Sequence, residues 1–250
     1  MQTLTPAQER AVRWYIGDVE GDDPFWGDDK AYVTINSLFF PGCSTEYQRN
    51  AEGKHLNPAL VSDEARLLAV LRDLLSAFQP LEQPVETYRV ERYVDYALLK
   101  EAAQTVSFTS TSTAGFLRAY QDRWGIALMR FSLRAGTPCI PMAQALPHYA
   151  KADEAEILLP PGLQLSFREL PLTPEELTIR DAKGNPVLVS AHCTACGDCI
   201  PCPEAPPLPG GNEAAVRFFR SLAQGEPENY QNEIQYARWK AGFVRMVTES

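Results

Sequence analysis

The sequence predicts an α+β fold, with helices at the two ends of the chain and β-strands in its middle. Three observations support this prediction: apolar residues recur at helical spacing before position 80, β-prone segments follow one another from 85 to 189, and a cysteine- and proline-rich stretch interrupts the chain at 192–211. We therefore expect four parts, namely a helical lobe over about residues 1–84, a mixed β core over about 85–190, a cysteine-rich loop over 191–211 and a helical extension over 212–250.

The first helix is expected to follow Thr5, which suits the N-cap, with Pro6 at the first helical position. Its apolar residues at helical spacing are Ala11, Trp14 and Tyr15. A second helix is expected from about Ser62, with acidic residues in its first turn, and it should end before Pro80. Between the two helices, residues 31–38 fit a helix or a strand equally well by propensity.

The β core is expected to contain five strands and one hairpin. In chain order the strands cover residues 87–90, 106–113, 126–133, 154–159 and 164–170, and the hairpin covers 179–189 with Lys183-Gly184-Asn185-Pro186 at its centre. Beyond the core, the stretch from His192 to Gly211 is too rich in cysteine and proline for a regular element. Two helices are expected after it, at about 212–223 and 227–247.

Composition and charge exclude several classes of protein. Apolar residues make up 45% of the 250 residues, which is ordinary for a globular protein, and the formal net charge of −9 argues against a nucleic-acid binder or a protein held on an anionic membrane. No apolar run is long enough to span a membrane. Residues 1–6 lack the basic and then apolar pattern of a signal peptide, so we expect cytoplasmic synthesis, and signal-independent export as an effector stays open.

Glu154 and Glu156 form the first candidate catalytic pair. Residues two apart in a strand point to the same face of the sheet, so their carboxylates would lie side by side. Proteins tolerate such repulsion where the charges face solvent or where an active site uses them. Taken alone, the pair fits a solvated strand face; two motifs upstream of it favour an active site.

These motifs are Tyr88-Arg89 and Phe108-Thr109-Ser110-Thr111-Ser112, each on an expected strand. With Glu154-Ala155-Glu156 they form an ordered set that resembles the mono-ADP-ribosyltransferases of the arginine, Ser-Thr-Ser, glutamate type, which include bacterial toxins. Residues 32–38 (YVTINSL) are similar to the helical lobe of the toxin-type members, and the segment with His148-Tyr149 is similar to their acceptor-side loop. The resemblance covers about the first 190 residues and implies a two-sheet core with an N-terminal helical lobe. The aromatic residues near the motifs, including the tyrosine of this loop, are expected to pack in the core or the loop.

The resemblance implies that NAD is the substrate, and it assigns roles around NAD. Arg89 would meet the two phosphates, for which a guanidinium is a charge-matched, multidentate partner. Ser110, Thr111 and Ser112 would hold the ribose and support the catalytic glutamate. Val90 stands where the family commonly has glycine, and it would contact the nicotinamide amide through its backbone groups.

Glu156 is the catalytic glutamate by the same resemblance. Departure of nicotinamide leaves an oxocarbenium-like ribose, and a carboxylate facing this developing cation stabilises the transition state more than the ground state. Glu154 would bind the acceptor and help to deprotonate it, and a glutamate at this position of the family pattern implies an arginine acceptor. The expected partner is therefore a protein with an exposed arginine; an immunity or inhibitor protein and the oligomeric state are left open.

Two other functions stay open at this point. An NAD glycohydrolase would use the same site with water in place of the acceptor. A non-catalytic protein-binding module would be a degenerate form of the fold that acts through the cysteine-rich loop and the C-terminal helices.

The cysteine-rich loop has no place in the transferase chemistry. Four of the six cysteines lie in one run, Cys193, Cys196, Cys199 and Cys202. This run favours structural zinc, although zinc ligands usually come in two separated pairs. The spacing is one residue short of a ferredoxin-type iron–sulfur run at its last step, and disulfides are the third alternative. The remaining cysteines, Cys43 and Cys139, are expected to be buried thiols.

Overall fold

The structure of the protein is a computed structural model. It describes residues 3–19, 21–27, 31–32, 35–36, 59–60, 63–93, 96, 99–100, 103–105, 107–116, 125–146, 149, 152–180 and 184–195. The expected C-terminal helices, Cys43 and three cysteines of the run, Cys196, Cys199 and Cys202, lie outside these residues. The described residues fall into two compact units, one within residues 2–78 and the other within 79–200.

The two helices predicted before position 80 are present in the N-terminal unit. Helix α1 (Pro6–Tyr15) begins with a capping box in which the Thr5 hydroxyl accepts from the Gln8 N–H at 3.3 Å, and the Gln8 side chain accepts from the Thr5 N–H at 2.9 Å. Helix α5 (Glu64–Ser76) begins at the cap of Asp63, one residue after the expected start. Gln8 also donates to the Ser76 carbonyl at 2.9 Å, which ties the start of α1 to the end of α5.

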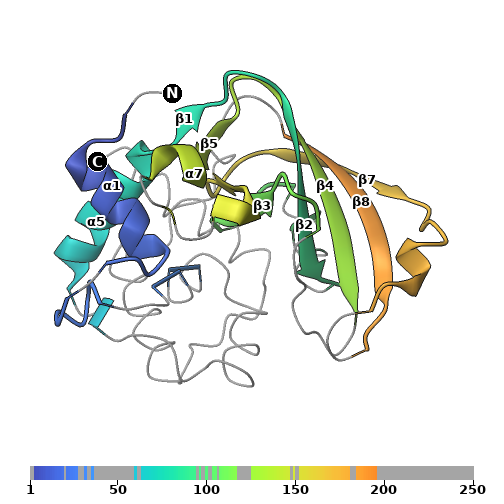
Figure 1. The fold of residues 1–250 in the computed structure, drawn as a ribbon, viewed down its shortest axis with the longest axis horizontal. Coiled ribbons are helices and arrows are strands. Elements are labelled where there is room, and N and C mark those ends of the chain that lie inside the picture. The colour runs from blue at the N-terminus through green and yellow to red at the C-terminus, as the bar shows by residue number, and fades with distance from the viewer. Residues whose placement is uncertain are drawn as a thin grey trace, which may run out of the picture. The chain divides into compact units, whose positions relative to one another are not determined.

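The second unit is built on an eight-stranded mixed sheet (Figure 1). Its strands are β1 (Gln79–Pro80), β2 (Val85–Arg92), β3 (Thr109–Ser112), β4 (Ile126–Leu133), β5 (Pro138–Pro141), β6 (Glu156–Leu159), β7 (Leu165–Leu170) and β8 (Val187–Ala195). The short helical elements around it are α7 (Met142–Ala145), η2 (Ala152–Glu154) and η3 (Glu176–Thr178). The strand order is β1-β5-β6-β3-β2-β4-β8-β7, and β4 and β8 form the parallel pair in an otherwise antiparallel sheet.

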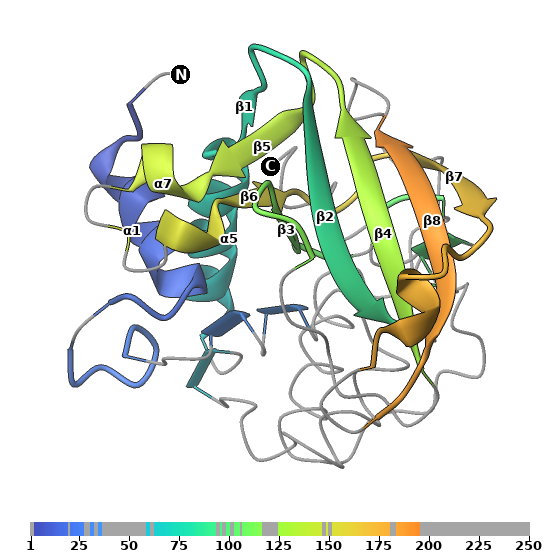
Figure 2. The same ribbon diagram turned by 45° about the vertical axis from the view of Figure 1, so that its right-hand side comes forward.

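The sheet consists of two unlike halves. The long-stranded half, β2, β4, β8 and β7, has strands of six to nine residues that lie side by side as curved ribbons (Figure 2). The short-stranded half, β1, β5, β6 and β3, has strands of two to four residues. Among the described residues, one pair of strand residues, Tyr88 with Ser112, joins them. The expected core of two sheets is therefore a single sheet with a narrow junction.

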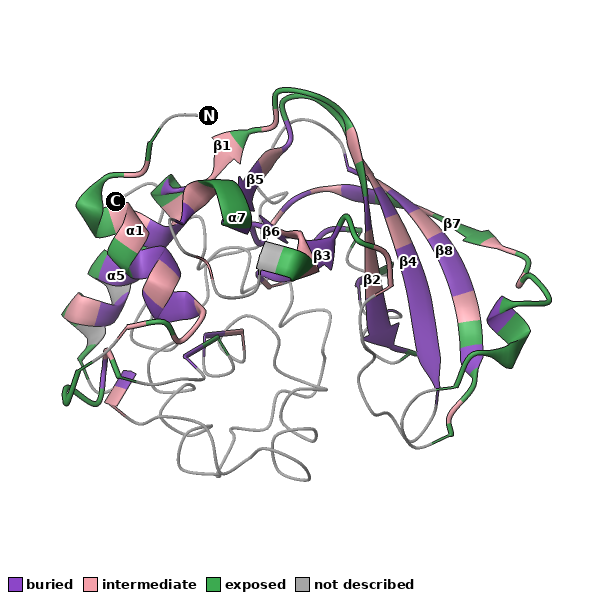
Figure 3. Ribbon diagram, in the orientation of Figure 1, coloured by how far each residue is buried: buried purple, intermediate pink, exposed green. Residues whose placement is uncertain are grey.

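Strand β4 forms the buried centre of the long-stranded half (Figure 3). It has the bounds that the sequence predicts, because a nearly continuous apolar run is typical of a strand covered on both faces. Ile126 and Leu128 pack with Val90 of β2 and Val187 of β8 in one apolar cluster. None of the helices in the described part of the chain is long and apolar enough to cross a membrane.

Strand β8 corrects the predicted end of the β core. The expected hairpin over 179–189 is reduced to one bridge between Arg180 and Pro186, and β8 then pairs with both β4 and β7. His192 and Cys193 thus belong to a strand and not to a loop, and the expected boundary at residue 190 falls inside β8. The reason is that Ala191, Cys193 and Ala195 are small apolar residues that alternate inward, so this stretch has the period of a strand despite its cysteine.

Candidate active site

The three predicted motifs come together at the junction between the two halves. Strand β3 lies between β2 and β6, Tyr88 of β2 is opposite Ser112 of β3, and Ser112 is opposite Glu156 of β6. Arg89, the Ser-Thr-Ser run and the catalytic glutamate of the sequence prediction are therefore on three adjacent strands. They come from segments that are far apart in the sequence, so their meeting is a property of the fold.

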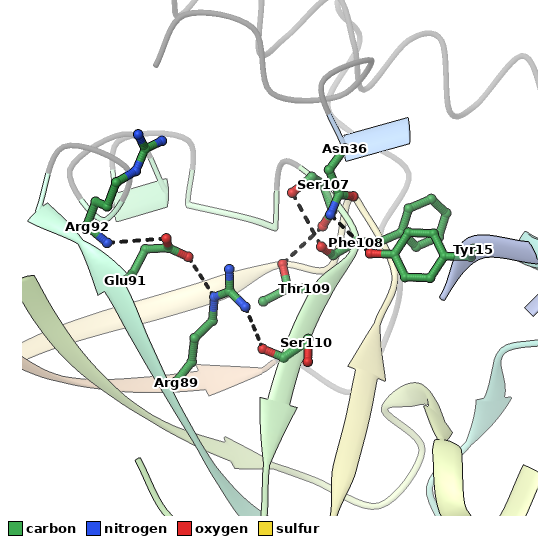
Figure 4. A network of polar contacts seen from close by, with 9 residues as sticks. All are labelled: Tyr15, Asn36, Arg89, Glu91, Arg92, Ser107, Phe108, Thr109 and Ser110. Carbon is green, nitrogen blue, oxygen red and sulfur yellow. Dashed lines mark hydrogen bonds and ion pairs between the residues drawn. The ribbon is translucent and has the colours of Figure 1, made fainter. Parts of the chain in front are cut away.

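Arg89 is held from two sides (Figure 4). Its Nε donates to the Glu91 carboxylate at 2.6 Å, and its Nη1 donates to the carbonyl of Ser110 on β3 at 2.7 Å. The Arg89 side chain is 16% exposed and the Glu91 side chain is 6% exposed, so water screens the charges of this ion pair weakly. Glu91 also accepts from the Arg92 N–H at 3.3 Å. The direction of the guanidinium is thus fixed by its own strand and by the next one.

Glu91 belongs to the candidate site although it is not part of any of the three sequence motifs. The sequence does indicate this contact, because a glutamate two residues after an arginine in a strand points to the same face of the sheet as that arginine. Val90, between the two, has a buried side chain in the apolar cluster of the long-stranded half.

Side chains of the Ser-Thr-Ser run form hydrogen bonds with the segment that carries the two glutamates. The Thr111 hydroxyl donates to the carbonyl of Ile157 at 2.9 Å, and the Ser112 hydroxyl donates to the carbonyl of Glu154 at 2.6 Å. Ser112 also accepts from the Ala114 N–H at 2.9 Å. The side chains of β3 thus extend the backbone pairing of β3 and β6 into the turn before β6.

Glu154 and Glu156 do not share a strand face, which corrects the sequence prediction. Glu154 ends the 3-10 turn η2, Ala155 has a left-handed φ of 46°, and Glu156 is the first residue of β6. The backbone departs from a strand because β3 groups capture its carbonyls: Ser112 binds that of Glu154, and the Thr113 N–H binds that of Ala155 at 3.2 Å. Alternation in the sequence could not reveal these contacts.

Tyr149 contacts the carboxylate of Glu156. Its hydroxyl donates to Glu156 Oε2, and both side chains are half-buried. Burial, and secondly the neighbouring Glu156 carboxylate, raise the pKa of Tyr149 above that of a free tyrosine, so the phenol stays a donor through the neutral range. From the sequence, this tyrosine is expected only to pack in the core or the loop, because it lies seven positions before the glutamate and shares no strand pattern with it.

The cysteine run is only partly described. Cys193 is buried in β8, opposite Phe131 of β4 and Phe167 of β7, and burial raises the pKa of its thiol to about 12. The metal site predicted at the four cysteines stays a prediction, because Cys193 is the one member of the run that lies within the described residues. No cluster of three or more potential metal ligands occurs among the residues that the structure describes. Cys139 is a buried thiol, as expected.

Solved structures, and not sequences, are where known proteins similar to this chain are found. No family model matches the chain, and no curated protein matches it in sequence. Among solved structures, the enzymatic component of the C2 toxin from Clostridium botulinum is similar to this chain at 16% identity with a TM-score of 0.43, over 78% of this chain and 44% of that one. An ADP-ribosyltransferase from Clostridium botulinum is similar at 12% identity with a TM-score of 0.41, over 76% of this chain and 88% of that one.

A third similar structure is the ADP-ribosylating toxin BECa from C. perfringens, solved with NADH. It has 16% identity and a TM-score of 0.39, over 77% of this chain and 44% of that one. The chain therefore spans less than half the length of the C2-toxin component and of BECa.

Proposed function

We propose that this chain is a mono-ADP-ribosyltransferase that moves ADP-ribose from NAD to a protein side chain and releases nicotinamide. One observation carries the proposal: Arg89, the Ser-Thr-Ser run and Glu156 lie on the adjacent strands β2, β3 and β6. These are the three motifs whose order in the sequence resembles this class of enzyme.

Arg89 is the proposed contact to the phosphates of NAD. A guanidinium presents its donors in a planar fork, and the contacts to Glu91 and Ser110 set the plane of that fork before NAD binds. A fixed fork loses little conformational entropy on binding, so it recognises a phosphate better than a mobile side chain does. The ribose next to these phosphates would lie over β3, whose Ser110 is partly exposed.

Glu156 is the proposed catalytic residue. In the reaction, the bond between the ribose C1′ and the nicotinamide nitrogen breaks, and its electron pair leaves with nicotinamide. The ribose becomes oxocarbenium-like, and the nucleophile of the acceptor then bonds to C1′ and loses its proton. A carboxylate at the start of β6 stabilises the developing cation more than it stabilises bound NAD.

Glu154 is the proposed acceptor residue, and arginine is the proposed acceptor. The turn at Ala155 separates the two glutamates, so Glu154 can face a second ligand while Glu156 faces the ribose. An arginine side chain keeps its charge at neutral pH because its pKa is above about 12, so a carboxylate is both its docking partner and a base for it. Mapping of the modified residue by mass spectrometry tests this assignment, and modification at any other residue type contradicts it.

The central experiment uses labelled NAD and a cell lysate, with nicotinamide release and protein labelling followed together. Glu156→Gln should lower both rates by at least about a hundredfold, since it removes the charge that stabilises the transition state. Glu169→Gln is the matched control, because Glu169 also accepts a hydrogen bond from a tyrosine, Tyr96, but lies on β7. Equal rates in wild type and Glu156→Gln would refute the proposal, and nicotinamide release without labelled protein would identify water as the acceptor.

A further inference from the structure

The carboxylate of Glu156 is not held by the strand next to it. The hydroxyls of Thr111 and Ser112 donate to backbone carbonyls, those of Ile157 and Glu154, and not to this carboxylate. Within the described residues, the hydrogen bond to the carboxylate comes from Tyr149, in the segment before η2. The Ser-Thr-Ser run thus fixes the backbone under Glu156, while a residue from another segment contacts its charged group.

We propose that Tyr149 is a positioning residue that holds Glu156 by its Oε2 atom and so directs its Oε1 atom toward the ribose of bound NAD. This inference rests on the function proposed above, and it gives the two carboxylate oxygens different tasks. A carboxylate at the first residue of a strand has several side-chain rotamers of similar energy. A hydrogen-bond donor on one carboxylate oxygen selects one of these rotamers before the substrate binds. Such preorganisation is what electrostatic stabilisation of a transition state requires.

The phenol suits this task because it remains neutral. A neutral donor bonds to one oxygen and leaves the negative charge of Glu156 in place, whereas a lysine or an arginine would neutralise it. Burial and the adjacent carboxylate raise the pKa of Tyr149, so the proton stays on the tyrosine. The half-buried setting also limits competition from water for the same oxygen.

The test compares Tyr149→Phe with Tyr96→Phe in the full chain. Each variant removes one hydroxyl that donates to a glutamate, but Tyr96 bonds to Glu169 of β7, five strands away from β6 in the strand order. Nicotinamide release is measured over a range of NAD concentrations, and thermal unfolding is recorded for each variant. Tyr149→Phe should lower kcat roughly ten- to a hundredfold, as expected for a hydrogen bond to a charged group, with KM for NAD within about twofold of wild type. Tyr96→Phe should leave kcat unchanged.

A double variant separates positioning from a general structural effect. If Tyr149 acts through Glu156, adding Tyr149→Phe to Glu156→Gln should change the residual rate by less than about twofold, because the group to be positioned is already lost. A multiplicative loss in the double variant overturns the inference. So does an unchanged kcat in Tyr149→Phe, or a rise in KM for the acceptor alone, which would make Tyr149 an acceptor-binding residue.

The outcomes also distinguish the two proposals from each other. A wild-type protein that releases no nicotinamide from NAD refutes the function and with it the role of Tyr149. An active wild type, an inactive Glu156→Gln and a fully active Tyr149→Phe refute only the positioning role.

Discussion

The two halves of the sheet fix their backbone in different ways. In the long-stranded half, β2 and β4 pair along their full lengths, and β8 pairs with β4 on one side and with β7 on the other. In the short-stranded half, β3 and β6 share four residue pairs, and the turn beyond them is held by the side chain of Ser112 and the backbone of Thr113. Ladder hydrogen bonds form with almost any sequence, whereas side-chain hydrogen bonds need particular residues.

This difference predicts that the stability of the protein and its proposed catalysis depend on different halves of the sheet. The long-stranded half contributes Arg89, but the two glutamates, the Ser-Thr-Ser run and Tyr149 belong to the other half or to its connections. Substitutions that weaken the long-stranded half far from the junction should therefore lower stability and leave the rate per folded molecule unchanged. Substitutions in the short-stranded half should lower the rate per folded molecule and have little effect on stability. The predictions below test this contrast, beginning with the largest expected effect.

Glu176→Gln should have the largest effect on stability. The buried carboxylate of Glu176 accepts from Arg130 of β4 at 2.5 Å, from Ser190 of β8 at 3.1 Å and from the Thr173 N–H at 3.0 Å. Loss of its charge should lower the free energy of unfolding by about 2 kcal/mol, the scale for hydrogen bonds to a buried charged group. Denaturant unfolding measures this loss, and kcat for nicotinamide release should stay as in wild type. Glu175→Gln, one residue earlier and exposed, is the control.

The same residue predicts a dependence of stability on pH. Burial acts to raise the pKa of Glu176, but the hydrogen bonds from Thr173 and Ser190 and the charge of Arg130 outweigh it, so the folded-state pKa is lowered from 4.5. A lowered folded-state pKa gives a contribution that is present above pH 4.5 and is lost as the pH falls through the folded value. The difference in unfolding free energy between wild type and Glu176→Gln should therefore shrink on acidification. A constant difference from neutral to acid pH would contradict this assignment.

Arg89→Lys should have the next largest effect, on NAD binding. An ammonium cannot donate to Glu91 and to the Ser110 carbonyl in the geometry of Nε and Nη1, so the direction of the charge is lost. We expect KM for NAD to rise about tenfold with kcat nearly unchanged, because in the proposed function Arg89 binds the phosphates of the substrate and of the transition state alike. Arg168→Lys, exposed on β7, is the control and should leave KM as it is. An unchanged KM for NAD in Arg89→Lys would contradict the proposed contact between Arg89 and NAD.

The sequence predicted the elements that depend on local patterns. The bounds of β4 follow from its apolar run, and α1 begins as predicted because Thr5, Pro6 and Gln8 form a cap within a few residues of one another. The Arg89 and Ser-Thr-Ser motifs were found for a similar reason, since each is a short run on one strand. Local chemistry is readable from the sequence because the interacting groups are neighbours in it.

The sequence did not predict the features that depend on tertiary contacts. Strand β5 has proline at both ends and becomes a strand only by pairing with β1 and β6, for example Ile140 with Leu158. The turn between Glu154 and Glu156 exists because Ser112, some forty residues earlier, binds a carbonyl in it. The contact of Tyr149 with Glu156 is likewise a tertiary contact that no repeating pattern in the sequence indicates. These contacts lie in or beside the short-stranded half, where side chains fix the backbone.

Ala155→Gly is the smallest change and the sharpest test of that half. Ala155 has a φ of 46°, and Ala103 has a φ of 52°, so each holds a Cβ in the left-handed region that glycine adopts freely. Removing either Cβ relieves about 1 kcal/mol of strain, and the greater freedom of glycine in the unfolded chain offsets part of it, so both variants should be stabilised by about 0.5 kcal/mol or less. Only Ala155 separates the two glutamates, so its variant should lower kcat about two- to fivefold by loosening the angle between them, while Ala103→Gly should not. Equal kinetics in the two variants would mean that the Ala155 turn is held by its contacts with Ser112 and Thr113 alone, whichever residue occupies it.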